Sequence, residues 1–294
     1  MDRTVGLIGL GRMGIPMGVH MQSHLAAQGD QLIGFDLSEA ARSAAHEAGL
    51  RVMPDLDQLL RDSSILITML PGSPMVEAVL LGDAARENLR SGTVVMDMSS
   101  SEPLSTRRLA EDLEQRGITL IDAPVSGGVV GAVAGTLTIM VGGDDTTVET
   151  MTPLLSSMGK VVRTGAVGSG HALKALNNLL SGTHLLVSAE ALEIGRRFGL
   201  SDDIMLEVIN SSTGRSWSTQ FKLPTFIVPE TYNSGFAMSL LVKDMTIATD
   251  LARELGLPSR LGETSRALWA QASGELGPEA DHTEIARFAA HPDA

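Results

Sequence analysis

The stretch RTVGLIGLGRMGIPMG, residues 3–18, joins a short apolar run to three glycines in the pattern Gly9-x-Gly11-x-x-Gly14. The apolar run is typical of a β-strand, and a helical pattern follows the last glycine. Gly9 permits a tight turn, Gly11 lets the backbone approach a ligand, and Gly14 allows close helix packing. The N–H groups that open the helix then face an anion such as a pyrophosphate. The stretch predicts a dinucleotide-binding strand–turn–helix unit; glycines in an ordinary βα turn are the alternative.

A second apolar run, QLIGFD, ends on an acid, Asp36, which lies 22 residues after Gly14. A carboxylate at the end of the second strand accepts hydrogen bonds from a ribose diol and repels a 2′-phosphate. Asp36 therefore favours NAD over NADP. Arg42 is the alternative phosphate ligand, but it falls in the helical stretch SEAARSAAHEAG, where we expect it to be solvated. Arg12 and Met13, between the glycines, are assigned to the cofactor site, and the sequence leaves open whether Arg12 meets phosphate or substrate.

Composition fits an enzyme of this kind. The 294 residues suit about two domains, and 43% of them are hydrophobic. A formal charge of −13 argues against nucleic acid and against anionic membranes as partners. The chain has no cysteine, which excludes disulfides and thiolate chemistry. No signal pattern and no long apolar run occurs, so we expect a soluble cytoplasmic protein. His20 and His24 have helical spacing without a metal-binding motif, and we expect no metal site.

Strand and helix patterns alternate along the first half of the chain. The predicted strands are apolar runs, typical of strands covered on both faces, at 31–36, 65–70, 93–98, 118–125, 136–143 and 160–165. Beyond Gly170 the pattern predicts helices at 171–197, 201–212, 236–256, 258–273 and 282–290. The proline-containing tract 216–235 predicts a loop. We therefore predict an α/β protein: an N-terminal Rossmann-type doubly wound sheet, residues 1–165, followed by an all-helical C-terminal domain, residues 166–294.

The run GSGHALKALNN, residues 168–178, opens the long predicted helix. Helical spacing places Lys174, Asn178 and Ser181 on one stripe. In a buried polar pocket such groups orient one another, and a lysine there can have its pKa lowered toward neutrality. Lys174 is therefore the candidate acid/base; a solvated surface lysine is the alternative. The helix is long enough to link both domains and a partner subunit.

Nearly the whole chain resembles the β-hydroxyacid dehydrogenases, in particular their 3-hydroxyisobutyrate dehydrogenase branch. The motifs that carry the resemblance, in the order the family has them, are GLGRMGIPM, MLP (69–71), DMSSSEP (97–103), DAPVSGG (122–128), GTLTIMVGG (135–143), GSGHALKALNN (168–178), GRSWS (214–218), FAMSLLVKD (236–244) and DHTEIARF (281–288). The resemblance implies that Lys174 is the catalytic lysine and that Asn178 is a substrate-side amide. It assigns the loop Ser126, Gly127 and Gly128 to the substrate carboxylate and Trp217 to the pocket wall. It assigns Leu70, Pro71, Ser100 and Lys243 to the cofactor site.

Several of these residues also have plainer interpretations. The loop that contains Ser126 follows a strand end, where glycines can present N–H groups to a carboxylate, or it is a flexible turn. Lys243 and Asp244 form a surface ion pair in the alternative interpretation. Trp217 and Phe221 are more often core residues. Arg215 is a candidate for a second anionic group.

The sequence departs from the family in its first helix, which is extended by one turn. A four-residue insertion nearly preserves the helix face, so the cofactor assignment survives. The resemblance implies NAD-dependent oxidation of a small 3-hydroxy acid to its semialdehyde or keto acid, or the reverse reduction. Because the long helix and the helical tail expose more apolar surface than one domain can cover, we also expect a homodimer or homotetramer. The alternatives are a dinucleotide-binding sensor or scaffold without turnover, and a semialdehyde or imine reductase of the same architecture.

Overall fold

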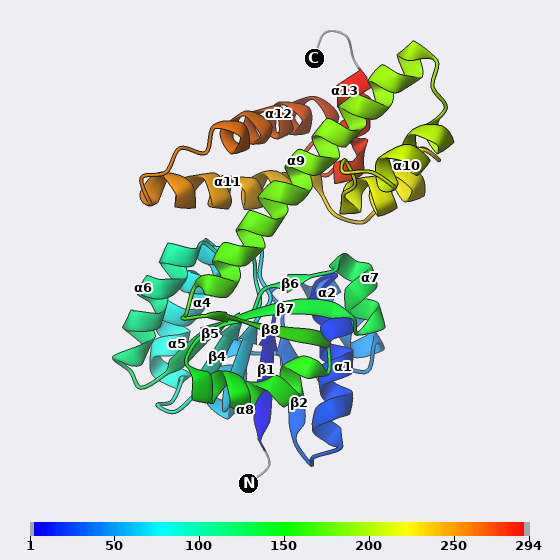
Figure 1. Ribbon diagram of the computed structural model, residues 1–294. Helices are drawn as coiled ribbons and strands as arrows, with labels where there is room; N and C mark the ends of the chain where they lie inside the picture. The colour runs from blue at the N-terminus through cyan, green and yellow to red at the C-terminus, as the bar shows by residue number, and fades with distance from the viewer. Residues whose placement is uncertain (1–2, 291–294) are drawn as a thin grey trace. The chain divides into compact units, whose positions relative to one another are not determined.

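The structure, a computed structural model, describes residues 3–290. The chain forms two compact units that divide between Lys174 and Ala175. The first unit is built on a β-sheet and the second is helical (Figure 1). The division falls inside helix α9, Ser169–Phe198. The domain limits 1–165 and 166–294 stay a prediction.

The first unit contains one eight-stranded sheet in the order β2-β1-β3-β4-β5-β7-β6, with β8 paired to β7. Its strands are β1 (Thr4–Ile8), β2 (Gln31–Phe35), β3 (Ile65–Thr68), β4 (Val94–Asp97), β5 (Thr119–Asp122), β6 (Val125–Ser126), β7 (Leu137–Gly142) and β8 (Gly159–Gly165). β1 to β5 pair in parallel, whereas β7 runs antiparallel to β5 and β6. The predicted Rossmann-type sheet is confirmed.

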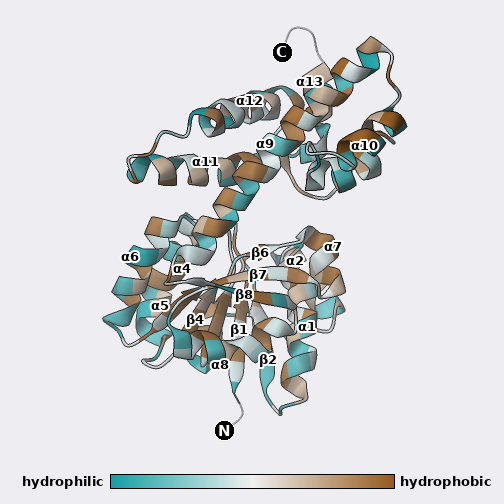
Figure 2. Ribbon diagram, viewed as in Figure 1, coloured by the Kyte–Doolittle hydropathy of each residue, from teal (hydrophilic) through white to brown (hydrophobic). Residues whose placement is uncertain are grey.

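Helices cover both faces of this sheet, as the apolar strand runs predict. Val5 and Leu7 of β1 face a core built with α1, α7 and α8, while Ile8 faces a second core built with α3 to α6. Figure 2 shows the strands mainly in the hydrophobic colours. The helices are α1 (Gly14–Ala26), α2 (Glu39–Glu47), α3 (Leu56–Asp62), α4 (Ser73–Leu81), α5 (Asp83–Asn88), α6 (Pro103–Glu114), α7 (Gly128–Ala134) and α8 (Asp145–Ser156). The sheet is therefore doubly wound.

The predicted strand 118–125 is interrupted. It forms β5 and β6, and the two residues between them include Pro124. Proline has no N–H to donate to a sheet ladder, so the strand ends where it enters. The carbonyl of Pro124 still accepts a hydrogen bond from the Met140 N–H at 3.0 Å. The break ends β5 and leaves Val125 and Ser126 in a separate short strand, β6.

The second unit is helical and has its own core. Trp269 is fully buried in it and donates a hydrogen bond from Nε1 to the Gly182 carbonyl at 3.1 Å. The elements of this unit, with residues 175–198 of α9, are α10 (Asp202–Asn210), η1 (Ser218–Ile227), α11 (Met238–Glu254), α12 (Arg260–Leu276), η2 (His282–Glu284) and α13 (Ile285–Ala290). The all-helical second half is confirmed.

The predicted loop 216–235 is wrong over its first half. Residues Ser218–Ile227 form a π-helix, η1, that contains Pro224. Ser216 and Thr219 cap its start with reciprocal hydrogen bonds, from Ser216 N–H to Thr219 Oγ1 at 2.8 Å and from Thr219 N–H to Ser216 Oγ at 3.2 Å. Leu223 and Ile227 are buried in the helical core. Prolines in this tract favour a loop, but the Ser216–Thr219 cap and the apolar i, i+4 pair Leu223 and Ile227 favour a helix.

Candidate active site

The glycine turn has the geometry that the motif predicts. Gly9 has φ +103°, and a Cβ there would collide with the Met69 carbonyl oxygen. A Cβ at Gly14 would collide with the Gly9 carbonyl oxygen, so helix α1 starts directly against the turn. At Gly11 a Cβ would meet no protein atom within 4 Å. Gly9 and Gly14 are therefore needed by the fold, whereas Gly11 keeps the backbone open to a ligand, which fits a pyrophosphate.

Asp36 directly follows β2 and is tied to the glycine turn. Its Oδ2 accepts from the Leu10 N–H at 2.8 Å, and its Oδ1 accepts from the Ser38 N–H at 2.8 Å. Each carboxylate oxygen keeps a further lone pair that can accept from a ribose diol. Arg42 is half-buried, and its Nη1 donates to the carbonyls of Asp36 and Leu37 at 2.6 and 3.0 Å. A carboxylate and a guanidinium thus share the end of β2.

The remaining predicted cofactor residues of this unit also follow strand ends. Leu70 and Pro71 come after β3, and Ser100 comes after β4. The Leu70 N–H donates to Ser99 Oγ at 2.9 Å, which joins the two segments. Because β1, β3 and β4 are parallel, their carboxyl ends lie at one edge, where open α/β sheets bind ligands. The residues predicted to bind the dinucleotide therefore gather at this edge.

The loop assigned to the substrate carboxylate lies at the junction of β6 and α7. Ser126 ends β6, and Gly127 and Gly128 have φ +129° and +62°. Both glycines are exposed, and a Cβ at Gly128 would meet no atom within 4 Å. Two consecutive positive φ values require glycine. The loop has a defined, open conformation that suits the approach of an anion to its backbone.

Lys174 belongs to the first unit, near the start of α9, where its side chain is half-buried. The same helix starts at the carboxyl edge of the sheet, since Asp122, the last residue of β5, accepts from the Gly168 and His171 N–H groups at 2.6 and 2.8 Å. The glycine turn and the helix that carries Lys174 therefore begin at the same edge of one sheet. Neither Asp122 nor His171 is among the site residues predicted from the sequence.

In the second unit Asn178 is buried and hydrogen-bonded to α11. Its Nδ2 donates to Asp244 Oδ2 at 2.6 Å. Lys243 Nζ lies 3.2 Å from Asp244 Oδ1. The ion pair of the alternative interpretation is therefore present, but its carboxylate is buried, because Asp244 is only 3% exposed. The carboxylate orients the Asn178 amide and holds Lys243 beside it.

Two other residues of the second unit differ from expectation. Ser181 Oγ accepts from Lys222 Nζ at 3.1 Å, and Lys222 lies on η1, where a loop was predicted. Sequence reasoning therefore missed Lys222. Trp217 is 64% exposed, with its ring centroid 5.0 Å from that of Phe221. Because its indole is exposed, Trp217 is not a core residue and can line a pocket.

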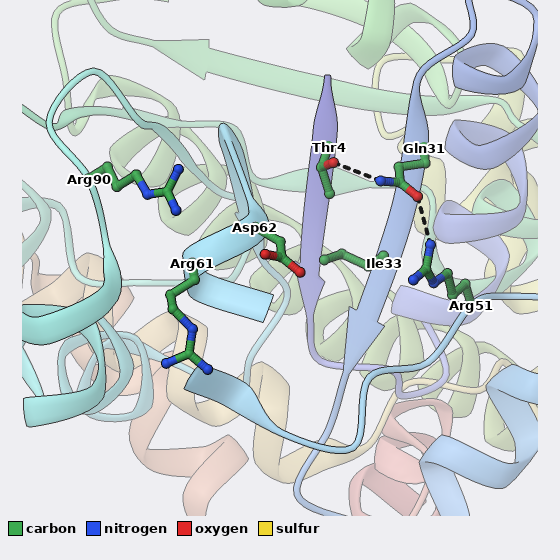
Figure 3. A pocket seen from close by; sticks show the side chains of 7 residues that line it. All are labelled: Thr4, Gln31, Ile33, Arg51, Arg61, Asp62 and Arg90. Atoms are coloured by element: carbon green, nitrogen blue, oxygen red, sulfur yellow. Dashed lines mark hydrogen bonds between the residues drawn. The ribbon is translucent and has the colours of Figure 1, made fainter. Parts of the chain in front are cut away.

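A separate pocket of about 300 Å³ lies at the opposite ends of the strands, at the first residues of β1 and β2 (Figure 3). It is lined by Thr4, Gln31, Ile33, Arg51, Arg61, Asp62 and Arg90. Gln31 joins two of its walls, since it donates to Thr4 Oγ1 and accepts from Arg51 Nη1. This end of the sheet is not where dinucleotides bind. Within residues 3–290, no group of three or more metal-binding side chains is found.

Two family models cover the chain. The one described as the NAD binding domain of 6-phosphogluconate dehydrogenase matches residues 4–168, and the one described as NAD-binding of NADP-dependent 3-hydroxyisobutyrate dehydrogenase matches residues 168–289. The 2-(hydroxymethyl)glutarate dehydrogenase of Eubacterium barkeri is 40% identical over 86% of this chain and 84% of its own length. The mitochondrial 3-hydroxyisobutyrate dehydrogenase of Homo sapiens is 33% identical over 97% and 86%. The chain belongs to the β-hydroxyacid dehydrogenase family.

Solved structures agree with this membership. The 3-hydroxyisobutyrate dehydrogenase of Mycobacterium tuberculosis, in a structure with L-serine, superposes with a TM-score of 0.90 at 29% identity and covers 98% of this chain and 99% of its own. An imine reductase from Myxococcus stipitatus in complex with NAD⁺ has a TM-score of 0.64 at 18% identity, covers 98% of this chain and 99% of its own, and shares the fold alone. The β-hydroxyacid dehydrogenase relatives are named dehydrogenases of hydroxy acids. Both family models are described as NAD-binding, the second for an NADP-dependent enzyme, which agrees with a nicotinamide dinucleotide as the cofactor.

None of the helices within residues 3–290 is long and apolar enough to cross a membrane.

Proposed function

We propose that this β-hydroxyacid dehydrogenase oxidises the hydroxyl group of a small 3-hydroxy acid to its semialdehyde or keto acid, with NAD as the preferred cofactor, and catalyses the reverse reduction. One observation carries the proposal: the glycine turn and the helix that bears Lys174 start at the same carboxyl edge of one sheet. That edge is where a nicotinamide and a proton acceptor have to meet.

When bound, the nicotinamide would supply the redox chemistry as the hydride acceptor. The residues of this chain bind, orient and move the proton. The neutral amine of Lys174 takes the proton of the substrate hydroxyl as the C–H bond breaks. In the reverse reaction the Lys174 ammonium returns that proton to the carbonyl oxygen.

Substrate orientation is assigned to three elements. The backbone N–H groups of the Ser126–Gly128 loop hold the carboxylate. Asn178, oriented by Asp244 through the 2.6 Å hydrogen bond, donates to or accepts from the reacting hydroxyl. Trp217 walls the pocket. These assignments keep the hydroxyl in line with Lys174, which is the main way a protein accelerates such a transfer.

The NAD preference is supported by Asp36, whose carboxylate disfavours a 2′-phosphate. Leu70, Pro71, Ser100 and Lys243 are proposed to contact the cofactor. A homodimer or homotetramer is supported by exposed apolar residues spaced by seven along α9, Leu180, Val187 and Ile194, which are 58, 53 and 70% exposed. Light scattering that reports a single 30.9 kDa chain at low concentration would contradict assembly. The cytoplasmic location stays a prediction for cell fractionation to test.

The function is tested by following NADH formation with a panel of acids. The panel contains 3-hydroxyisobutyrate, 2-(hydroxymethyl)glutarate, serine, glycerate, threonate, 4-hydroxybutyrate and sulfonated analogues. We expect turnover of at least one 3-hydroxy acid and poor turnover of 4-hydroxybutyrate, whose hydroxyl lies one carbon farther from the carboxylate. NAD binding with no turnover of any member, in either direction, favours the sensor alternative. Turnover of cyclic imines in place of carbonyls favours the imine reductase alternative.

A further inference from the structure

Three titratable side chains are buried together where β4 and β5 end. Asp97, Asp122 and His171 are each no more than 1% exposed. Asp97 accepts from Thr68 Oγ1, the Ser99 N–H and Ser101 Oγ. The proposed chemistry uses none of the three. Burying charged or polar groups is costly unless each finds partners, so this cluster needs an explanation.

Asp122 caps helix α9 from outside the helix. Its two oxygens accept from the Gly168 and His171 N–H groups at 2.6 and 2.8 Å. The first N–H groups of a helix have no partner within it, and a negative charge there is favourable. Burial raises the pKa of Asp122, and the nearby His171 and these two amides oppose that rise. The last residue of β5 thereby fixes where α9 begins.

The His171 side chain ties the same turn to β4 and α6. Its Nε2 lies 3.1 Å from the Ser99 carbonyl oxygen, and because a carbonyl only accepts, Nε2 carries a proton. Its Nδ1 lies 2.8 Å from Thr106 Oγ1. The ring also lies 3.7 Å from an Asp97 oxygen and 3.9 Å from an Asp122 oxygen. Both ring nitrogens are therefore held in place.

Ser99 connects this histidine to the segments assigned to the cofactor. Its Oγ accepts from the Leu70 N–H at 2.9 Å, and its carbonyl accepts from His171 Nε2. Lys174 follows His171 by three residues, about one helical turn. A short path of hydrogen bonds thus runs from the Leu70–Pro71 segment, through Ser99, to the turn of α9 that precedes Lys174.

Two glycines let the helix approach closely enough for this path. A Cβ at Gly170 would collide with the Met140 carbonyl oxygen of β7. A Cβ at Gly142 would lie 2.6 Å from Asp122 Oδ1 and 2.7 Å from Ser169 Oγ. The first turn of α9 therefore packs directly on the sheet, with no room for adjustment.

We propose that Asp122 and His171 are positioning residues: they fix the first turn of α9, and with it Lys174, relative to the segments Leu70–Pro71 and Ser99–Ser100. The proposal rests on the proposed function, in which Lys174 exchanges a proton with the substrate. A displacement of about 1 Å in a reacting group can lower the rate about 100-fold. Neither residue is proposed to touch substrate or cofactor.

The first test separates position from stability at His171. His171→Leu removes the Nε2 donor but fills the volume, and we expect kcat to fall by about tenfold or more with the Kd for NAD nearly unchanged. His171→Gln can donate to the Ser99 carbonyl and should recover most of kcat. His184→Leu, at an exposed position on the same helix, is the matched control. A His171→Leu enzyme that folds and retains its kcat overturns the proposal.

The second test compares two helix caps. Asp144 caps α8 by accepting from the Thr147 N–H at 2.9 Å, as Asp122 caps α9. Asp122→Asn should lower kcat by about tenfold, whereas Asp144→Asn should leave it unchanged, although both lose a charged cap. Equal effects on kcat from the two variants contradict positioning, since a general loss of stability would then explain both.

A third measurement does not depend on activity. Amide hydrogen exchange of the peptide 168–174, in protein without substrate, should be faster in Asp122→Asn and His171→Leu than in wild type and unchanged in Asp144→Asn. Unchanged exchange in all variants overturns the anchoring itself. Faster exchange with an unaltered kcat reduces the cluster to a structural role and overturns positioning. A wild-type protein without turnover refutes the proposed function, while the exchange result still decides the anchoring.

Discussion

The carboxyl edge of the sheet and the helical unit hold their polar groups by different means. At the sheet edge backbone groups take part in many of the contacts: Gly9 shapes a turn, and Asp122 accepts from two N–H groups. In the helical unit side chains hold side chains, as in Asn178 with Asp244 and Lys222 with Ser181. Backbone geometry is shared by every sequence with this fold, whereas side-chain pairs can be exchanged. This difference supports the proposal that the sheet edge holds the reacting groups and that the helical unit sets the substrate selectivity.

The largest expected effect is at Lys174. Lys174→Ala should lower kcat by about 100-fold or more and leave the Kd for NAD nearly unchanged, because the glycine turn holds the cofactor. Lys174→Arg should lower kcat almost as much, since a guanidinium stays protonated near neutral pH and cannot accept the hydroxyl proton. Steady-state kinetics and a fluorescence titration of NAD measure the two quantities. If Lys174→Ala keeps most of its kcat, Lys174 does not exchange the proton with the substrate.

Two substitutions in the glycine turn separate an effect on folding from an effect on NAD binding. Gly9→Ala puts a Cβ against the Met69 carbonyl at a positive φ, and should lower the free energy of unfolding by about 1–3 kcal/mol. Gly11→Ala meets no protein atom, so it should leave that free energy unchanged and raise the Kd for NAD about tenfold. Thermal melts and NAD titrations check both. Equal NAD affinity in wild type and Gly11→Ala would show that the turn does not cradle a pyrophosphate.

Asp36 should decide the choice of dinucleotide. We expect kcat/KM with NAD to exceed that with NADP by at least about tenfold, or about 1.4 kcal/mol. Asp36→Ala should narrow the ratio, because it removes the repulsion of a 2′-phosphate while Arg42 stays at the carbonyls beside it. Kinetics with both dinucleotides measure the ratio, with Asp30→Ala as a control away from the turn. Equal or better use of NADP by the wild type would refute the preference.

The last of these effects concerns stability alone and compares the buried histidines of the two units. His171 has partners at both ring nitrogens, whereas Nε2 of His282 has none among the described residues. Burial, helped by Lys222, lowers the pKa of His282 from 6.5 to about 3. The unfolded chain therefore binds the proton more readily between these values, and the free energy of unfolding should fall by about 1.4 kcal/mol per pH unit below 6.5.

Urea unfolding at pH 7 and pH 5 tests this slope. The wild type should lose about 2 kcal/mol, and His282→Gln should lose less, with the exposed His184→Gln as control. Burial favours a higher pKa for Asp281, but hydrogen bonds from Thr283 and Ser234 lower its pKa below the usual 3.8. Asp281 therefore changes the free energy of unfolding only below about pH 3.8, outside the range from pH 5 to pH 7. An unchanged slope in His282→Gln would assign the acid sensitivity to other groups.

The sequence was sufficient for the parts of the site that short-range rules determine. The glycine spacing, the acid at the end of the second strand and the helix around Lys174 each follow from local patterns, and the family comparison agrees with the fold. Contacts between distant residues could not be predicted. Asp122 and His171 lie 49 residues apart, and Asn178 and Asp244 lie 66 apart. Their pairing depends on strand register and helix packing, which no local pattern contains.

The π-helix Ser218–Ile227 shows a different limit. Prolines in the tract 216–235 predict a loop because they interrupt a regular hydrogen-bond ladder. The Ser216–Thr219 cap and the packing of Leu223 stabilise a helix nevertheless, and Lys222 reaches Ser181 from it. Tertiary packing outweighed local propensity there.

The central claim, that Lys174 exchanges a proton with the substrate, is tested most directly by the pH dependence of hydride transfer. Single-turnover oxidation of the best substrate should be measured from about pH 6 to 10 in wild type and in Lys174→Ala, both saturated with NAD. The account predicts that the wild-type rate rises with pH as Lys174 loses its proton, and that this rise disappears in the variant. The same pH-dependent rise in Lys174→Ala would contradict it, because another group would then be the proton acceptor.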